Sequence, residues 1–210
     1  GTMKLLNRIY KEQWLFFRGE CRKIFLMVFI LFFLSCLGAF SIGFSAPDQV
    51  SKIMETIRQV FDEMDLLDPG KTNMEIALGL FQNNLRVCLL VVAAGFIPIF
   101  LPAMALLTVN GAIIGIVLSF FQISGGSALT LFLAGILPHG LFEIPAILLA
   151  GTLSLFISKG IWSRLFRGKP FGPTVVKSVK AALFLIVPLL ILAALTEAYI
   201  TPMILGKTGL

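Results

Sequence analysis

Charged residues are scarce in this sequence. Asp, Glu, Lys and Arg together make up 13% of the chain, about half the share that is usual in soluble domains. Hydrophobic residues make up 58%, and they fall in runs of about twenty, each long enough to cross the hydrocarbon core of a bilayer as a helix. The composition excludes an ordinary water-soluble domain. It predicts an all-α, polytopic integral membrane protein with about five transmembrane helices.

Metal-ligating and nucleophilic residues are also few. The sequence has one histidine, His139, and three cysteines, Cys21, Cys36 and Cys88. Their number is odd, and no CxxC or Cys/His spacing of a zinc site is present. We therefore expect no disulfide framework, no metal site and no cofactor, and we assign no catalytic residue.

The charges that are present are segregated along the chain. Basic residues precede the first apolar run and recur at 159–180, which contains no acid, whereas the segment 47–83 is acidic. The positive-inside rule then predicts a multi-pass protein of the cell (cytoplasmic) membrane with its N-terminus inside and 47–83 outside. The basic segments are expected to contact lipid headgroups and not nucleic acid, because no nucleic-acid-binding motif accompanies them.

The hydropathy pattern divides the chain into six segments. These are a cytoplasmic amphipathic helix at 3–22, a first transmembrane helix at 23–46, an extracytoplasmic amphipathic helical pair at 47–83, a polytopic core with broken helices at 84–158, a basic cytoplasmic loop at 159–180 and a last transmembrane helix at 181–203.

The extracytoplasmic segment has helical periodicity in two places. Apolar residues recur at i, i+3, i+4 and i+7 from Val50 to Met64. Thr72 and Glu75 have the spacing of a capping box that opens a second helix. We expect the two helices to pack on each other as an external cap over the membrane domain; the alternative is that each lies on the outer leaflet.

Prolines and glycines interrupt the polytopic core. A second span is expected at about Leu85–Leu107, followed by a break at Val109-Asn110-Gly111. The next apolar piece, Ala112–Phe121, is short, so it either crosses with polar ends or forms half of a re-entrant hairpin. In the long stretch that follows, Pro138 and Gly140 predict a broken helix. The spacing Gly111-x-x-x-Gly115 indicates close helix packing.

Polar residues within the apolar stretches form the candidate site, because such residues are costly in a bilayer. The intramembrane polar cluster is predicted to consist of Asn83, Asn84, Arg86, Asn110, His139 and Glu143. His139 and Glu143 are four residues apart and share a helical face. Four interpretations stay open: a hydrogen-bonded lock between broken helices, an ion or proton pathway through Glu143, an intramembrane hydrolase, and a pocket for a partner or ligand.

Several of these motifs resemble the stage II sporulation protein M family. They are the string Leu137-Pro-His-Gly-Leu-Phe-Glu-Ile-Pro-Ala146, Leu149-Ala-Gly151, Phe81-x-Asn-Asn84 and Asn110-Gly111. The resemblance covers most of the chain from Phe81 to Ser158 and is to the broader branch that keeps the Pro-His-Gly-x-x-Glu string. It implies a polytopic bacterial or archaeal membrane protein, and sporulation members are scaffolds that recruit cell-wall-degrading partners.

The residues and the resemblance together favour a non-enzymatic membrane scaffold or assembly factor. Its expected partners are the lipid bilayer and other membrane or envelope proteins, with a possible homo-oligomer and no nucleic acid. A transporter or channel component that uses Glu143 is the alternative, and an intramembrane hydrolase is third.

Overall fold

The computed structural model describes residues 1–63 and 69–208, with the side chains of Phe61, His139, Leu205, Lys207 and Thr208 excepted. Within this part the chain is helical and contains no strand. The described helices include five that are long and apolar enough to cross a membrane. These are Thr2–Gly43, Asn73–Ala94, Leu101–Ile123, Gly140–Arg167 and Gly172–Ile204. The all-α fold with five such helices is as predicted from composition.

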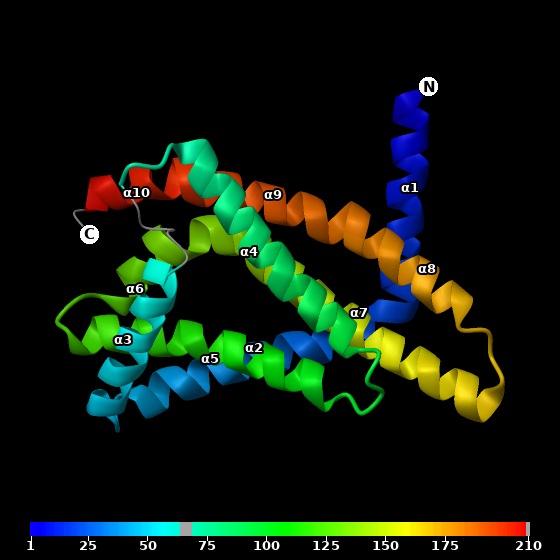
Figure 1. Ribbon diagram of the computed structural model, residues 1–210, viewed down its shortest axis with the longest axis horizontal. Coiled ribbons are helices and arrows are strands. Elements are labelled where there is room, and N and C mark those ends of the chain that lie inside the picture. The colour runs from blue at the N-terminus through cyan, green and yellow to red at the C-terminus, as the bar shows by residue number, and fades with distance from the viewer. Residues whose placement is uncertain (64–68, 209–210) are drawn as a thin grey trace.

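The elements follow one another with short connections. In order they are α1 (Thr2–Phe16), η1 (Phe17–Cys21), α2 (Arg22–Gly43), α3 (Pro47–Glu63), α4 (Asn73–Ala94), α5 (Leu101–Ile123), α6 (Ala128–Thr130), η2 (Leu131–Ile136), α7 (Leu137–Arg167), α8 (Gly172–Ala181), η3 (Ala182–Ile186), α9 (Val187–Leu195), η4 (Thr196–Ile200) and α10 (Thr201–Thr208). The four η elements are π-helical turns between α-helices. Figure 1 shows that α1 points away from the bundle and that the chain enters the bundle through η1.

Helices α2 and α5 lie side by side and parallel. Gly111 faces the backbone of Phe32, and one turn further along each helix Gly115 faces the carbonyl oxygen of Cys36. A side chain at either glycine would overlap the α2 backbone, so the absence of Cβ atoms allows the close approach. The close packing predicted for Gly111-x-x-x-Gly115 is confirmed.

Helix α7 is the central element of the molecule and the most enclosed of the five long helices. It packs against α2, α4, α5 and α9, and every residue from Gly151 to Ser158 is buried. Small residues at the contacts let these neighbours approach. The backbone of Ser154 lies against Gly95 at the end of α4, and the side chain of Leu107 of α5 packs against Gly151. The centre of the bundle is therefore close-packed around α7.

The region predicted as a helical pair is built differently. The capping box is confirmed, because the Glu75 N–H donates to Thr72 Oγ1 and the Thr72 N–H donates to Glu75 Oε2. The helix it opens, α4, does not stop near Leu85 but continues to Ala94. Helix α3 caps the adjoining ends of α2 and α5 (Figure 1), where Arg58 lies over the ring of Phe120. The predicted packing of two helices on each other is wrong for the described residues; Met64 lies outside them.

The predicted break at Asn110-Gly111 is also wrong. Helix α5 runs without interruption from Leu101 to Ile123, so the piece that includes Ala112–Phe121 is the second half of a full-length helix. The interruption lies earlier, between Ala94 and Leu101, where Phe100 adopts a left-handed conformation with φ 62°. Pro102 then occupies the first turn of α5, where its missing N–H costs nothing. Gly111 is a packing residue, as the Gly111-x-x-x-Gly115 spacing predicted, and it does not break the helix.

The predicted basic loop at 159–180 is mostly helical. Helix α7 continues to Arg167 and α8 begins at Gly172, so the connection is only a tight turn with Gly168 at φ 64°. Long basic side chains can extend from helix ends toward water, so their charge does not end a helix. The last long helix accordingly begins about ten residues before the predicted 181.

The irregularity predicted at Pro138 and Gly140 lies about one turn earlier. The turn Leu131–Ile136 is π-helical, and Pro138 and Gly140 belong to the regular first turns of α7. Proline has no N–H to donate to the preceding turn, and this favours a wider turn before it. The ribbon bends where η2 meets α7 (Figure 1).

Candidate functional site

Three helices enclose the candidate site. Helices α4 and α7 pack in parallel, and the final helical segment, α9 with η4, packs against both of them. Glu143 lies in the second turn of α7, after Pro138 in the first. The bend before α7 thus places the beginning of this helix, and Glu143 with it, between α4 and η4.

Glu143 faces one titratable side chain from each neighbouring helix. Its carboxylate is close enough to Cys88 of α4 and to Glu197 of η4 for their charges to interact. Cys88 is buried, and both glutamates are partly buried. The structure therefore places the Glu143 carboxyl group within electrostatic range of the Cys88 thiol and of the Glu197 carboxyl group, each more than fifty residues away in the sequence.

Glu197 is absent from the sequence-based prediction. It is an acid within the last apolar run, so the argument that selected Glu143 applies equally to it. It lies three to four residues before the end of that run, so the sequence alone favours a position of its side chain at the membrane–water interface. Only the antiparallel packing of the last helix on α7 places Glu197 opposite Glu143.

The predicted residues of α4 lie on two faces. Asn84 precedes Cys88 by one helical turn, so the two share a face of α4. Asn83 and Arg86 instead line an open surface cavity of about 520 Å³ together with Lys71 and Glu75. Arg86 is exposed there.

Asn110 and His139 complete the predicted set. The amide of Asn110 donates a hydrogen bond of 2.7 Å to the carbonyl oxygen of Leu106, within its own helix α5. His139 lies in the first turn of α7, but its side chain is outside the described part of the structure. A single hydrogen-bonded lock that joins all six predicted residues stays a prediction.

The grouped side chains limit the chemistry of this site. Two partly buried carboxyl groups whose charges interact can hold a proton or bind a cation, because both cannot carry an unbalanced charge at low cost. Among the described side chains, no three His, Cys, Asp or Glu residues are grouped so as to hold a metal ion. The site is suited to holding or moving a proton or a cation, or to joining α4, α7 and η4 through polar contacts.

Comparison with known proteins identifies related sequences. The model of the family described as stage II sporulation protein M matches residues 24–202. Two uncharacterized proteins of Methanocaldococcus jannaschii are similar to the chain. The first is 31% identical over 137 residues, which cover 63% of this chain and 58% of the relative. The second is 32% identical over 127 residues, which cover 60% of this chain and 70% of the relative. No solved structure matches.

Proposed function

Because this chain belongs to the stage II sporulation protein M family, we propose that it is a non-enzymatic membrane scaffold that assembles other envelope proteins. Sporulation-type recruitment of cell-wall enzymes, which the resemblance implies, is one form of this role. The proposal includes a multi-pass topology in the cell membrane with the N-terminus inside.

The proposed topology agrees with the arrangement of the helices. The basic segment around Arg22 and the basic turn between α7 and α8 are at one end of the bundle, and α3 is at the other end (Figure 1). Three long helices, α4, α5 and α7, connect the acidic segment to the basic turn. In the proposed topology these three crossings put the acidic segment outside and both basic segments inside.

The observation that carries the scaffold proposal is the exposed apolar face of α1. This helix precedes η1 and projects from the bundle (Figure 1). Met3, Leu6, Tyr10 and Trp14 follow one another at helical spacing on one side of it, and all four are exposed. Much of this apolar surface is left uncovered by the bundle, although Trp14 stacks on Phe17. An amphipathic helix of this kind serves as a docking element for another helix or for the bilayer surface.

Site-specific photo-crosslinking in native membranes tests the scaffold. A photoreactive residue at Tyr10 is on the apolar face of α1, and a matched residue at Arg8 is on the opposite, polar face. We expect discrete protein adducts from Tyr10 and not from Arg8. Adducts of Tyr10 with lipid alone would show that α1 only rests on the bilayer, and they would overturn the proposal.

A second function is favoured by the facing carboxyl groups of Glu143 and Glu197. Paired acids inside a helical membrane protein are suited to a proton or cation pathway. In liposomes, a pathway predicts ion or proton flux that Glu143→Gln abolishes, whereas a scaffold predicts no flux from either protein.

A further inference from the structure

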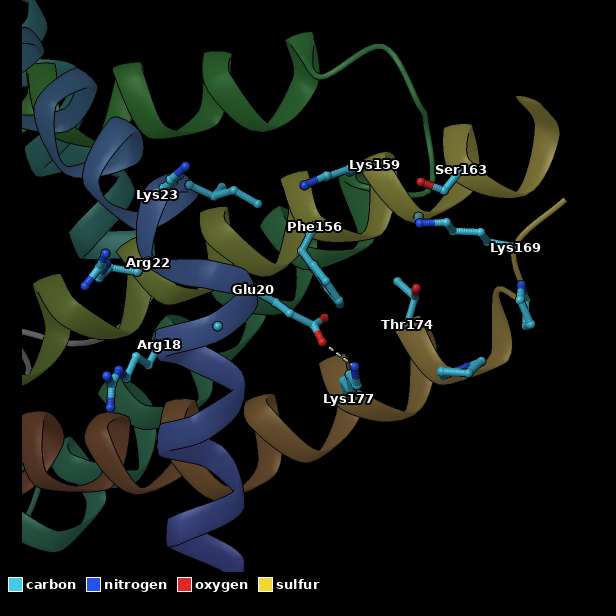
Figure 2. A pocket seen from close by; sticks show the side chains of 15 residues that line it. Arg18, Glu20, Arg22, Lys23, Phe156, Lys159, Ser163, Lys169, Thr174 and Lys177 are labelled. Carbon is cyan, nitrogen blue, oxygen red and sulfur yellow. Dashed lines mark hydrogen bonds and ion pairs between the residues drawn. The ribbon is translucent and has the colours of Figure 1, made fainter. Parts of the chain in front are cut away.

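The two basic segments of the chain meet around one cavity. It measures about 620 Å³ and lies where η1, the end of α7 and the beginning of α8 come together. Six basic residues line it, namely Arg18, Arg22, Lys23, Lys159, Lys169 and Lys177. In Figure 2 the side chains of Arg18 and Arg22 lie at the left and point away from Lys159 and Lys169. Residues from the first and the last third of the sequence thus contribute to a single strongly basic pocket.

The fold holds these elements firmly in place. Gly160 of α7 lies against the side chain of Thr174 of α8, an approach that a larger residue would prevent. Lys177 of α8 forms an ion pair with Glu20 of η1, and its ammonium group also lies 5.9 Å from the ring centre of Phe16. The pocket is therefore part of the packed structure and not a gap between loose segments.

The positive charge of the pocket is largely uncompensated. Glu20 is the one acid among the described lining residues, and Lys177 already neutralises it. No acid in the described part of the chain pairs with Lys23, Lys159 or Lys169. Close ammonium groups repel one another, so an anion between them would be bound favourably.

The remaining lining groups are suited to a phosphate. Figure 2 shows Lys159 and Ser163 of α7 above the open space and Thr174 of α8 below it, with Lys169 reaching in from the right and Phe156 on the left. Ammonium groups and hydroxyl donors bind phosphate oxygens through charge-assisted hydrogen bonds. We propose that this pocket binds a phosphate-bearing anion.

The surroundings of the pocket favour a lipid headgroup as the source of the phosphate. Trp162 and Phe166, one and two turns from Lys159, stack with ring centres 5.0 Å apart and are exposed. Exposed aromatic side chains of this kind mark the level of the membrane interface. Basic pockets between helices at that level bind anionic lipid headgroups. A soluble phosphate compound would use the same groups, so the experiment has one arm for each source.

Native mass spectrometry of the full chain in detergent tests the lipid arm. The probes are phosphatidylglycerol and, as the lipid without net charge, phosphatidylcholine. We expect selective binding of phosphatidylglycerol, weakened about tenfold or more in Lys159→Gln/Lys169→Gln. The matched control Lys4→Gln/Arg8→Gln removes the same charge from α1, and Lys159→Arg/Lys169→Arg keeps the charge in the pocket. Both should bind as the unsubstituted protein does.

Titration with inorganic phosphate and pyrophosphate forms the second arm. Binding that only the pocket variant loses would support the site with a soluble phosphate as its source. Two results overturn the proposal: neither probe class binds selectively, or the α1 control loses as much binding as the pocket variant. A loss of binding in the arginine variant, with its melting temperature unchanged, would also contradict a site based on charge.

Discussion

The hydroxyl of Ser158 donates a hydrogen bond of 2.6 Å to the carbonyl oxygen of Gly95, 63 residues earlier in the chain. Gly95 is the C-cap of α4, so no later N–H group of that helix donates a hydrogen bond to its carbonyl oxygen. Ser158 is fully buried on α7. The Ser158 hydroxyl of α7 therefore supplies a hydrogen bond to the carbonyl oxygen at the end of α4, and the contact fixes where the two helices cross.

Ser158→Ala should destabilise the protein by about 1–3 kcal/mol, because it leaves a buried carbonyl oxygen unsatisfied. Thermal unfolding in detergent measures the effect. The control is Ser51→Ala, which removes an exposed hydroxyl bonded only within α3 and should change the unfolding temperature little. Equal effects of the two substitutions would show that the bond between α4 and α7 contributes nothing.

Gly115→Ala should also destabilise, by about 1–3 kcal/mol, because the added Cβ would overlap the Cys36 carbonyl oxygen and separate α5 from α2. Gly38→Ala is the matched control, since Gly38 lies inside α2 and has open space beside it. It should be neutral or stabilise by up to about 1 kcal/mol through helix propensity. The comparison can be made by unfolding in the same detergent. A tolerated Gly115→Ala would contradict the close packing of these helices.

Substitutions of Glu143 should separate structure from chemistry. Glu143→Gln keeps the size and hydrogen-bonding capacity of the side chain, so a scaffold should retain its crosslinked partners. Glu143→Ala should destabilise by about 1–3 kcal/mol, because polar groups that face it lose their partner. Partner capture and unfolding temperature are the two measurements, with the exposed Glu55→Gln as control. A folded Glu143→Gln protein that captures no partner would contradict the scaffold and favour chemistry at this carboxylate.

The proposed topology predicts which residues an impermeant maleimide reaches in intact cells. In a background with alanine at Cys21, Cys36 and Cys88, a single cysteine at Gln59 of α3 should be labelled and one at Arg167 of α7 should be protected. Both positions are exposed. Asp65, the natural choice for the outside, lies beyond the described residues. Permeabilised cells should label both positions equally, and labelling at Arg167 alone in intact cells would reverse the topology.

Much of the fold followed from local sequence. Apolar runs of helical length, the Thr72/Glu75 capping box and the Gly111-x-x-x-Gly115 spacing each depend on residues within one or two turns, and each has the predicted structure. Two errors concerned glycine and proline, at Gly111 and at Pro138, and the others concerned the packing of α3 and the helical structure of the basic segment. Gly111 occurs in an uninterrupted helix, because whether a glycine ends a helix or accommodates a neighbour depends on what packs against it.

The sequence by itself determined that the chain is helical and membrane-span-capable, because hydrophobic length and the satisfaction of backbone hydrogen bonds are local requirements. It also pointed to Glu143, since an acid in an apolar run is conspicuous without a structure. Only the tertiary structure decided that Glu197 and Cys88 face Glu143, and that Lys23 and Lys159 share one pocket. Both groupings depend on how helices that are distant in the sequence cross one another. The crossing is decided by close packing along the whole length of the helices, so no short segment of sequence encodes it.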